Sequence, residues 1–314
     1  MASHVSRRDD FGHERGMSRD TKAILSADRR FLTGLIGAPI KHSASPAMHE
    51  RAAEALGVHC HYQLIEVAGA GTEELRFLLE GVRRLGFAGV NVTFPYKEAI
   101  VPLLDELSPG AAAIGAVNAV VVRRGRLIGH NTDTTGFALA VADLVARSSA
   151  GEGAVAVLGA GGVGKAIAFA LSGLGVAELN IFDTDRAKVE ALAAQLPGEQ
   201  KVRIADRVEA ALQGAVGLVN ATPVGMLPSR ASPVPEGLLH RGLWVVDAVY
   251  SPLWTPLLLA AKAKGATVMT GRDLAVHQAA DAFELFTGLR PSTKEMGVAF
   301  DAVTAPGSAV GDAA

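Results

Sequence analysis

The first third of the chain alternates between short apolar runs and longer runs in which apolar residues recur every three or four positions. The short runs, in "FLTGLIGAPI", "HYQLIEV" and "FAGVNVTF", predict β-strands, whereas "SPAMHERAAEALG" and "TEELRFLLEGVRRLG" predict amphipathic helices. Ser45 is expected to cap the first helix, with Pro46 at its first position and Gly57 just past its end. Strands that alternate with helices predict a parallel sheet.

A second strand–helix cycle begins at Ala154. Strands are predicted in "AVAVL", "LNIFD", "GLVNAT" and "GLWVVDAVY", and helices in "KAIAFALSGLG" and "RAKVEALAAQL". Between the two cycles, "RRGR" at 123–126 is expected to turn a hairpin that joins "AVNAVVV" to "LIGHN". The chain is therefore predicted to be an α/β protein with two cores.

These cycles divide the chain into two predicted domains. The first spans 31–132 and is completed by C-terminal helices at 271–305, which include "HQAADAFELFTG". The second spans 133–270 and has the order of a Rossmann domain. A ligand cleft is expected between the two domains. Residues 1–30 lack the apolar centre of a signal peptide and are expected to form a flexible tail.

The composition excludes several classes of protein. Of 314 residues, 49% are hydrophobic and only 5% aromatic, which is typical of an α/β enzyme rich in Ala, Val and Leu. A formal net charge of −2 gives no basic field for nucleic acid or an anionic membrane. No apolar run is long enough to cross a bilayer. Cys60 is the only cysteine, so no internal disulfide can form and we expect a cytoplasmic protein.

The stretch "VLGAGGVGKA" fits two phosphate-binding patterns. Gly159, Gly161 and Gly164 match G-x-G-x-x-G, the turn that holds a dinucleotide pyrophosphate. Gly159, Gly164 and Lys165 also match most of G-x-x-x-x-G-K-[ST], the loop that holds a nucleoside triphosphate. Position 166 is alanine, however, and lacks the hydroxyl that would ligate magnesium.

Asp183, at the end of the next predicted strand, favours the dinucleotide interpretation, because an acidic residue there binds the ribose hydroxyls. An ordinary glycine-rich turn and an S-adenosylmethionine site are the alternatives. A carboxylate at 183 repels the extra phosphate of NADP, so NAD is the preferred cofactor, although Arg186 and Lys188 leave NADP possible. The residues expected to contact the dinucleotide are Gly159, Ala160, Gly161, Gly162, Val163, Gly164 and Asp183.

A dehydrogenase also needs a group that exchanges the hydroxyl proton as the hydride leaves. Lys97 follows a predicted strand in "NVTFPYK", and Asp133 lies at the domain junction in "GHNTD". A carboxylate can orient a lysine that acts as acid and base. Each residue also has a structural interpretation, in which Lys97 is a surface lysine and Asp133 a helix cap.

The histidines and cysteine of "VHCHY" do not predict a metal site. In a strand, His59 and His61 face one side and Cys60 faces the other, so the three side chains do not converge. We therefore expect no bound metal.

Several motifs together resemble the shikimate dehydrogenase family, including its quinate/shikimate branch. The likeness runs from about Phe31 to Gly288. It is carried by "SASPAMH", "GVNVTFPYK", "GAVNAV", "GHNTD", "GAGGVGKA", "VNATPVGM", "VYSPLWTPLL" and "HQAADAFELFTG". The resemblance implies a substrate-binding N-terminal domain and reversible NAD(P)-dependent oxidation of shikimate to 3-dehydroshikimate, or of quinate to 3-dehydroquinate, by a monomer or homodimer.

The resemblance also implies roles for individual residues. Lys97 and Asp133 match the catalytic pair, and Ser43 and Ser45 match the serines that bind the substrate carboxylate. The remaining matches are substrate-binding Thr93, Asn118, Tyr250 and Gln278, and Ala248 and Gly271, whose backbone would meet the nicotinamide. Such a site suits a small polyhydroxylated ring acid, because each buried hydroxyl left unpaired costs about 1–3 kcal/mol.

Departures from the family pattern leave the ring substrate open. Thr134 replaces the usual glycine after "NTD", as in the NAD-using quinate/shikimate branch, and Leu274 and Ala275 replace a Met-Leu pair. Ser45, in contrast, matches shikimate-selective members, since quinate acceptors often have threonine there. Two rival functions are a metabolite-sensing relative without activity, which would have lost Lys97 or Asp133, and a methyltransferase, which does not explain that pair.

Overall fold

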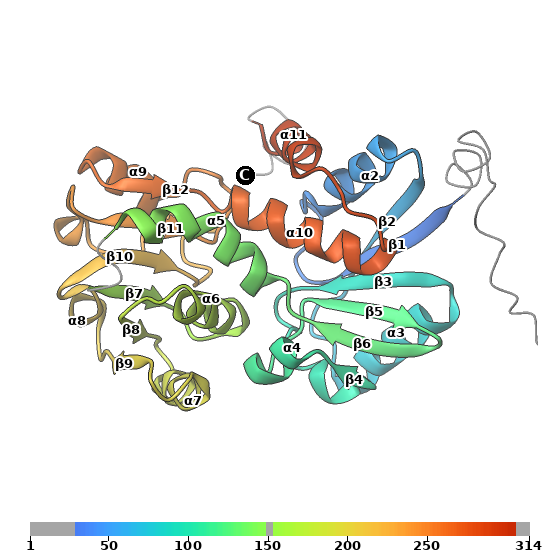
Figure 1. The fold of residues 1–314 in the computed structure, drawn as a ribbon, viewed down its shortest axis with the longest axis horizontal. Helices are drawn as coiled ribbons and strands as arrows, with labels where there is room; N and C mark the ends of the chain where they lie inside the picture. The colour runs from blue at the N-terminus through green and yellow to red at the C-terminus, as the bar shows by residue number, and fades with distance from the viewer. Residues whose placement is uncertain (1–28, 149–152, 306–314) are drawn as a thin grey trace, which may run out of the picture.

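The computed structural model describes residues 29–148 and 153–305, which form an α/β protein with two six-stranded sheets. The α/β class and the two separate cores are as predicted. The two sheets lie side by side in Figure 1, each with its own helices, and they define a first-sheet unit and a second-sheet unit. Most of the predicted tail, residues 1–28, lies outside the described residues.

The first sheet is mixed. Its strand order is β2-β1-β3-β5-β6-β4, with β1 parallel to both β2 and β3, as predicted. The β5–β6 hairpin adds antiparallel strands beside β3, and its turn at Arg124 and Gly125, both with positive φ, confirms the predicted hairpin. The strands are β1 (Arg30–Gly37), β2 (His59–Glu66), β3 (Phe87–Val92), β4 (Glu106–Leu107), β5 (Ala119–Arg123) and β6 (Arg126–His130).

Helices cover both faces of this sheet. Apolar residues of α3 (Thr72–Arg84) and α4 (Pro109–Ile114) share one core with β1, β3 and β5. On the other side, α2 (Ser45–Ala55) packs with two helices from the C-terminal end of the chain, α10 (Arg272–Thr287) and α11 (Thr293–Thr304). The C-terminal helices therefore return to the first-sheet unit.

The second sheet is parallel throughout, with the order β12-β11-β10-β7-β8-β9. This is the doubly wound Rossmann order, in which ligands bind where the strand order reverses, here between the carboxyl ends of β7 and β10. The strands are β7 (Ala154–Leu158), β8 (Glu178–Phe182), β9 (Lys201–Ile204), β10 (Ala215–Asn220), β11 (Trp244–Asp247) and β12 (Thr267–Met269).

Two layers of helices enclose the second sheet. One layer contributes Val141, Ile167 and Leu192 to a common core, and the other contributes Ala211 and Leu258 to the opposite core. The first layer comprises α5 (Asp133–Arg147), α6 (Gly162–Gly173) and α7 (Arg186–Gln195), and the second comprises α8 (Val208–Leu212) and α9 (Pro256–Ala263). The sequence analysis predicts α6 and α7 but not α5, α8 and α9.

Helices α5 and α10 connect the two units, and they cross near the middle of the molecule in Figure 1. The crossing is close at Gly136, where an added Cβ would lie 2.7 Å from the backbone nitrogen of Gln278. Thr132 fixes the same contact, because its hydroxyl donates to the Gln278 carbonyl (3.0 Å). The N-cap and first turn of α5 are therefore held against Gln278 of α10.

The predicted cap of α2 is wrong by one residue. The helix begins at Ser45, its N-cap is Ala44, and the Ser45 side chain makes no capping bond. The reason is that Ser43 Oγ accepts the backbone N–H of Ser45 (3.2 Å), so the chain already turns into the helix there. Gly57 follows the helix with φ +68°, as expected for its end.

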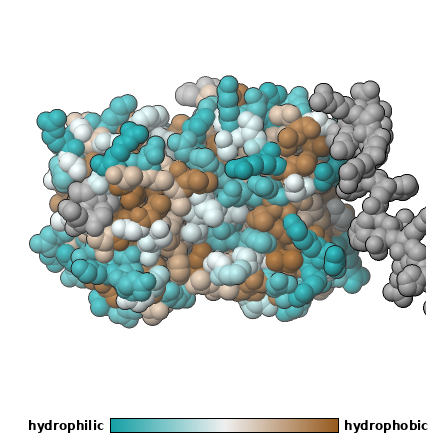
Figure 2. Space-filling view, viewed as in Figure 1, coloured by the Kyte–Doolittle hydropathy of each residue, from teal (hydrophilic) through white to brown (hydrophobic). Residues whose placement is uncertain are grey.

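The surface in Figure 2 carries hydrophilic residues over both units, with apolar residues gathered in smaller, separate areas. Among the residues that the structure describes, no helix is long and apolar enough to cross a membrane. Within that same part of the chain, no group of three or more His, Cys, Asp or Glu side chains is placed to hold a metal ion.

Candidate active site

Lys97 and Asp133 meet at the junction of the two units. Lys97 lies just after the turn that follows β3, and its carbonyl accepts the N–H of Val117 (2.8 Å). Asp133 is the first residue of α5. Lys97 Nζ lies 2.6 Å from Asp133 Oδ2, and the two side chains are only 13% and 9% exposed. The interpretation of Lys97 as a surface lysine is therefore excluded.

Asn118 holds the other oxygen of the Asp133 carboxylate. Its Nδ2 donates to Asp133 Oδ1 (2.8 Å), while its Oδ1 accepts the backbone N–H of Thr132 (2.7 Å). Asn131 Oδ1 accepts the backbone N–H of Asp133 (3.1 Å). Both carboxylate oxygens thus have a named partner, and the ammonium of Lys97 has a fixed place beside them.

The serine pair lies against two tyrosines. Ser43 Oγ donates to Ser45 Oγ (3.1 Å). Ser43 also lies beside Tyr250, and Ser45 lies beside Tyr62, close enough for each serine to lower the pKa of its neighbouring phenol. Burial raises the pKa of both tyrosines above the ordinary value of 10.0, and these serine contacts work in the opposite direction. Both phenols therefore remain protonated near neutral pH, and the four hydroxyls form one polar cluster.

A continuous polar path joins the serine pair to the Lys97–Asp133 pair. Tyr62 is buried, and its hydroxyl donates to Asn91 Oδ1 (2.9 Å). Asn91 Nδ2 donates to the backbone carbonyl of Asn118 (3.0 Å), and the Asn118 side chain reaches Asp133. Tyr62 and Asn91 are not among the predicted site residues. Asn91 lies inside the quoted "NVT" motif, whereas the sequence gives no local sign that Tyr62 is buried beside the serines.

Thr93 and Gln278 come from different parts of the first-sheet unit, the segment after β3 and helix α10. Thr93 is half-buried, its backbone N–H donates to the Ile36 carbonyl (2.9 Å), and its Cγ2 would lie 2.4 Å from a Cβ at Gly37. Gln278 is half-buried on α10, and its Nε2 donates to the Ala275 carbonyl (3.1 Å). The Thr93 backbone and the Gln278 side chain are thus each held by a hydrogen bond.

The glycine loop has the geometry of a dinucleotide-binding turn. Gly159 has φ +100°, which favours glycine, and its N–H donates to the Phe182 carbonyl (2.7 Å). A Cβ at Gly164 would lie 2.0 Å from the Gly159 carbonyl oxygen, so α6 and the loop can pack only with glycine there. A Cβ at Gly161 would meet nothing within 4 Å, which leaves room for a pyrophosphate.

Asp183 lies directly beside this loop. Its Oδ2 accepts the N–H of Ala160 (2.7 Å), and its Oδ1 accepts the N–H of Asp185 (2.9 Å). The carboxylate thus follows β8 and faces the loop after β7, which is the arrangement that binds a ribose in a Rossmann fold. Arg186 is paired with Glu190 (2.8 Å) rather than directed at Asp183.

The glycine loop also contacts the Lys97 side chain. A Cβ at Gly162 would lie 3.3 Å from Lys97 Cβ and 3.5 Å from its Cδ. Val163, the next residue of α6, packs on the core of the second sheet. The residues expected to hold a dinucleotide and the residue expected to move a proton are therefore close neighbours, although they come from different units.

Ala248 and Gly271 are brought together at the edge of the same junction. A Cβ at Gly271 would lie 2.8 Å from the carbonyl oxygens of Ala248 and Val249, so the start of α10 can approach this loop only as glycine. The loop is held by Asp247, which is fully buried and was not predicted as a site residue. Its carboxylate accepts hydrogen bonds from Thr255, Val249 and Asn220 (2.6, 3.0 and 2.9 Å).

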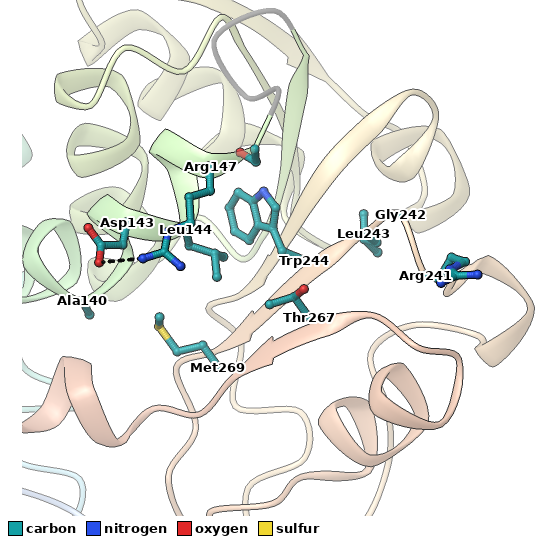
Figure 3. A pocket seen from close by; sticks show the side chains of 11 residues that line it. Ala140, Asp143, Leu144, Arg147, Arg241, Gly242, Leu243, Trp244, Thr267 and Met269 are labelled. Atoms are coloured by element: carbon teal, nitrogen blue, oxygen red, sulfur yellow. Dashed lines mark ion pairs between the residues drawn. The ribbon is translucent and has the colours of Figure 1, made fainter.

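Two cavities of the described chain lie outside the space between Lys97 and the glycine loop. One, of about 490 Å³, lies between the C-terminal half of α5 and the starts of β11 and β12, with Leu144, Trp244 and Met269 in its wall (Figure 3). The other, of about 540 Å³, lies behind the Asp133 segment, with His130 and Asp281 in its wall. Neither is lined by Lys97 or by the glycine loop.

Comparison with known proteins points to one family. Residues 35–120 match the model of the shikimate dehydrogenase substrate binding domain. A Streptomyces avermitilis protein named shikimate dehydrogenase (NADP(+)) is 44% identical over 85% of this chain and 93% of its own length. A Corynebacterium efficiens quinate/shikimate dehydrogenase (NAD(+)) is 43% identical over 86% of this chain and 97% of its own.

A solved structure agrees with these sequence matches. The quinate dehydrogenase of Corynebacterium glutamicum in complex with NAD aligns with a TM-score of 0.79 and 40% identity. The alignment covers 87% of this chain and all of the other (100%). The likeness therefore extends over both sheets.

Proposed function

The chain belongs to the shikimate dehydrogenase family, and we propose that it catalyses the reversible NAD(P)-dependent oxidation of shikimate to 3-dehydroshikimate. Oxidation of quinate to 3-dehydroquinate is the second candidate, supported by Thr134 and by the quinate-using relatives. The observation that carries the proposal is the buried Lys97–Asp133 pair in contact with a dinucleotide-binding turn. Neither a regulator without activity nor a methyltransferase requires that pair.

Lys97 is the proton-transfer residue of the proposed reaction. In the oxidation direction its amine accepts the proton of the ring hydroxyl, and in reduction its ammonium returns the proton to the carbonyl oxygen. Asp133 orients Nζ across 2.6 Å, and Asn118 keeps the carboxylate in place. In the oxidation direction, the bound oxidised dinucleotide would accept the hydride from the ring carbon that carries this hydroxyl.

The serine cluster is the proposed carboxylate-binding end of the site. Ser43 and Ser45 present hydroxyls, backed by Tyr250, that can donate to the substrate carboxylate. Thr93, Asn118 and Gln278 are the proposed partners of the ring hydroxyls. Such a set rejects rings that lack a hydroxyl, because the protein group left behind would be buried without a partner.

NAD is the proposed preferred cofactor. Asp183 supports it, because a carboxylate that already accepts the Ala160 N–H would meet the 2′-phosphate of NADP with like charge. The proposed dinucleotide contacts are the loop Gly159–Gly164, Asp183, and the backbone of Ala248 and Gly271. The predicted domain boundaries, 31–132 with 271–305 and 133–270, remain part of this proposal, as do a cytoplasmic location and a monomer or homodimer.

Replacing Asp183 tests the cofactor preference. Asp183→Ala should raise kcat/KM for NADP and lower it for NAD, with the ratio shifting by about tenfold or more. The measurement is initial rates with both cofactors at saturating shikimate. An unchanged ratio would mean that another group excludes the 2′-phosphate.

A four-way rate assay tests the function itself. Purified protein is given shikimate or quinate, each with NAD or NADP, and the absorbance of the reduced cofactor is followed. The proposal expects shikimate turnover with NAD faster than with NADP. Turnover of quinate as well would support the second candidate, and no rate in any combination would contradict both.

A further inference from the structure

A second ion pair joins the two units beside the Lys97–Asp133 pair. Lys165 Nζ, from the start of α6, lies 3.2 Å from Glu98 Oε1, and Glu98 directly follows Lys97 in the chain. The Lys165 side chain is 11% exposed, whereas the Glu98 side chain is 49% exposed. The proposed function uses neither residue.

The contact is continuous with the one between the glycine loop and Lys97. Gly162 and Lys165 are three residues apart on α6, so they lie on the same face of that helix. Gly162 meets the Lys97 side chain, and Lys165 meets Glu98. One helix turn of the second-sheet unit therefore contacts two consecutive residues of the first-sheet unit.

The direction of the Lys165 side chain also bears on whether this lysine binds phosphate, as the glycine-rich motif alone would allow. In a triphosphate-binding loop the lysine after the last glycine would bind phosphate, but here Ala166 lacks the hydroxyl that such a loop needs. In the structure the Lys165 ammonium is directed at Glu98 of the other unit. Its charge therefore acts on the junction between the units.

We propose that the Lys165–Glu98 pair is a tie between the units that holds the dinucleotide-binding turn against Lys97 and so sets the position of the Lys97 ammonium. This inference rests on the proposed function, because it takes Lys97 as the proton-transfer residue. Glu98 and Lys165 are positioning residues, which act through Lys97 and the loop. Since half of the Glu98 side chain is in water, the pair contributes little to the stability of the fold, so it can open to admit ligands and form again once they are bound.

The test combines a distance measurement with kinetics on the full chain. Nitroxide labels at Arg84→Cys on α3 and Glu190→Cys on α7, both exposed and in different units, report the separation of the units in a Cys60→Ser background. The variants are Glu98→Gln, Lys165→Gln, the double variant and Lys165→Arg. Asp143→Asn is the matched control, since Asp143 pairs only within α5 with Arg147 (3.6 Å) and both side chains are exposed.

If the pair is a tie, substituting Glu98 and substituting Lys165 should change the distance distribution and kcat in the same way. Glu98→Gln and Lys165→Gln should each broaden the distance distribution and lower kcat about five- to tenfold. The double variant should be no worse than the single variants, because the pair is already broken. Lys165→Arg should retain kcat within twofold, and so should the control. The dissociation constant of NADH should change equally little in Glu98→Gln and Lys165→Gln.

Other results overturn the proposal. If both single variants keep the wild-type distances and kcat, the pair does not tie the units. If the distances change but kcat does not, the pair is structural and does not position Lys97. If only Lys165→Gln weakens NADH binding, Lys165 is a phosphate ligand instead. If the wild-type protein turns over none of the four substrate and cofactor combinations, the proposed function fails. The tie is tested separately, because it is contradicted if the Glu98→Gln and Lys165→Gln variants keep the wild-type distance distribution.

Discussion

The two lysine–carboxylate pairs at the junction of the units, Lys97–Asp133 and Lys165–Glu98, differ in exposure and in the surroundings of the carboxylate. Asp133 is 9% exposed and its second oxygen accepts a hydrogen bond from Asn118, whereas 49% of the Glu98 side chain is exposed. The N–O distances are 2.6 Å and 3.2 Å. The first pair is therefore buried and held by a further partner, whereas the carboxylate of the second is half in water.

The difference shows how similar residues take separate tasks. A buried carboxylate with both oxygens engaged holds an ammonium in one place, which proton transfer to a bound ring requires. A carboxylate in contact with water gives little net energy, so it suits a contact that changes when a ligand arrives. Both pairs meet the same turn of α6, which is why the two tasks can be linked.

Breaking the first pair is expected to have the largest effect. Asp133→Asn removes the charge opposite Lys97 with little change in shape, and kcat for shikimate should fall about a hundredfold or more. The KM for shikimate should change much less, because the serine cluster is intact. Steady-state rates measure both values.

Asp143→Asn is the matched control for that variant, since it makes the same substitution in the same helix at an exposed position. Its kcat should equal that of the wild type. A loss in Asp133→Asn no larger than in this control would mean that the buried pair does not contribute to turnover.

Two glycines of the loop are expected to have different roles, one in the stability of the fold and the other in ligand binding. Gly164→Ala should cost about 3 kcal/mol of unfolding free energy, because its Cβ would lie 2.0 Å from the Gly159 carbonyl oxygen. Gly161→Ala should leave stability nearly unchanged, since its Cβ meets nothing within 4 Å. It should instead weaken NADH binding about tenfold or more. Urea unfolding and NADH fluorescence titration distinguish the two, and equal stability losses would contradict this account of the loop.

Asp247 gives a smaller, pH-dependent effect within the second-sheet unit. Burial raises the pKa of Asp247 from 3.8 to about 6, against the effect of its hydrogen bonds from Thr255, Val249 and Asn220. Between these pH values the folded protein holds a proton that the unfolded chain has released, so stability is lost as pH rises through 6. The loss between pH 5 and 7 is expected to be about 1 kcal/mol.

Asp247→Asn removes this titration and keeps the shape of the side chain. The unfolding free energy is measured by urea at pH 5 and pH 7. The decrease from pH 5 to pH 7 should be about 1 kcal/mol smaller in Asp247→Asn than in the wild type. A wild-type value that stays level or rises over this interval would mean that the carboxyl is already ionised at pH 5.

Much of the fold could be predicted from the chain, because its elements follow simple periods. The alternation in "HYQLIEV" and the three-to-four-residue spacing of "TEELRFLLEGVRRLG" correspond to β2 and α3. Helix α5 was not predicted, since its run from Asp133 is apolar on several sides and follows a loop-like "GHNTD". The start of α2 was misplaced because the Ser43 hydroxyl, which local preferences ignore, accepts the Ser45 N–H.

The residues of the candidate site also fall into those that local spacing predicts and those that depend on long-range packing. Gly159, Gly164 and Asp183 could be proposed as dinucleotide-binding residues from local spacing, since a turn of this kind has a fixed geometry. Tyr62 could not, because its burial depends on packing between β2 and α2, where its ring lies against that of His49. The Lys165–Glu98 contact joins segments of different sheets, and spacing along the chain carries no record of it.

The kinetics of Lys97→Ala show most directly whether Lys97 moves the proton. We expect kcat for shikimate oxidation to fall about a hundred- to ten-thousandfold, while the dissociation constants of shikimate and NADH stay within a fewfold of wild type. A variant that keeps near-wild-type kcat would contradict the assignment of Lys97 as the residue that moves the proton.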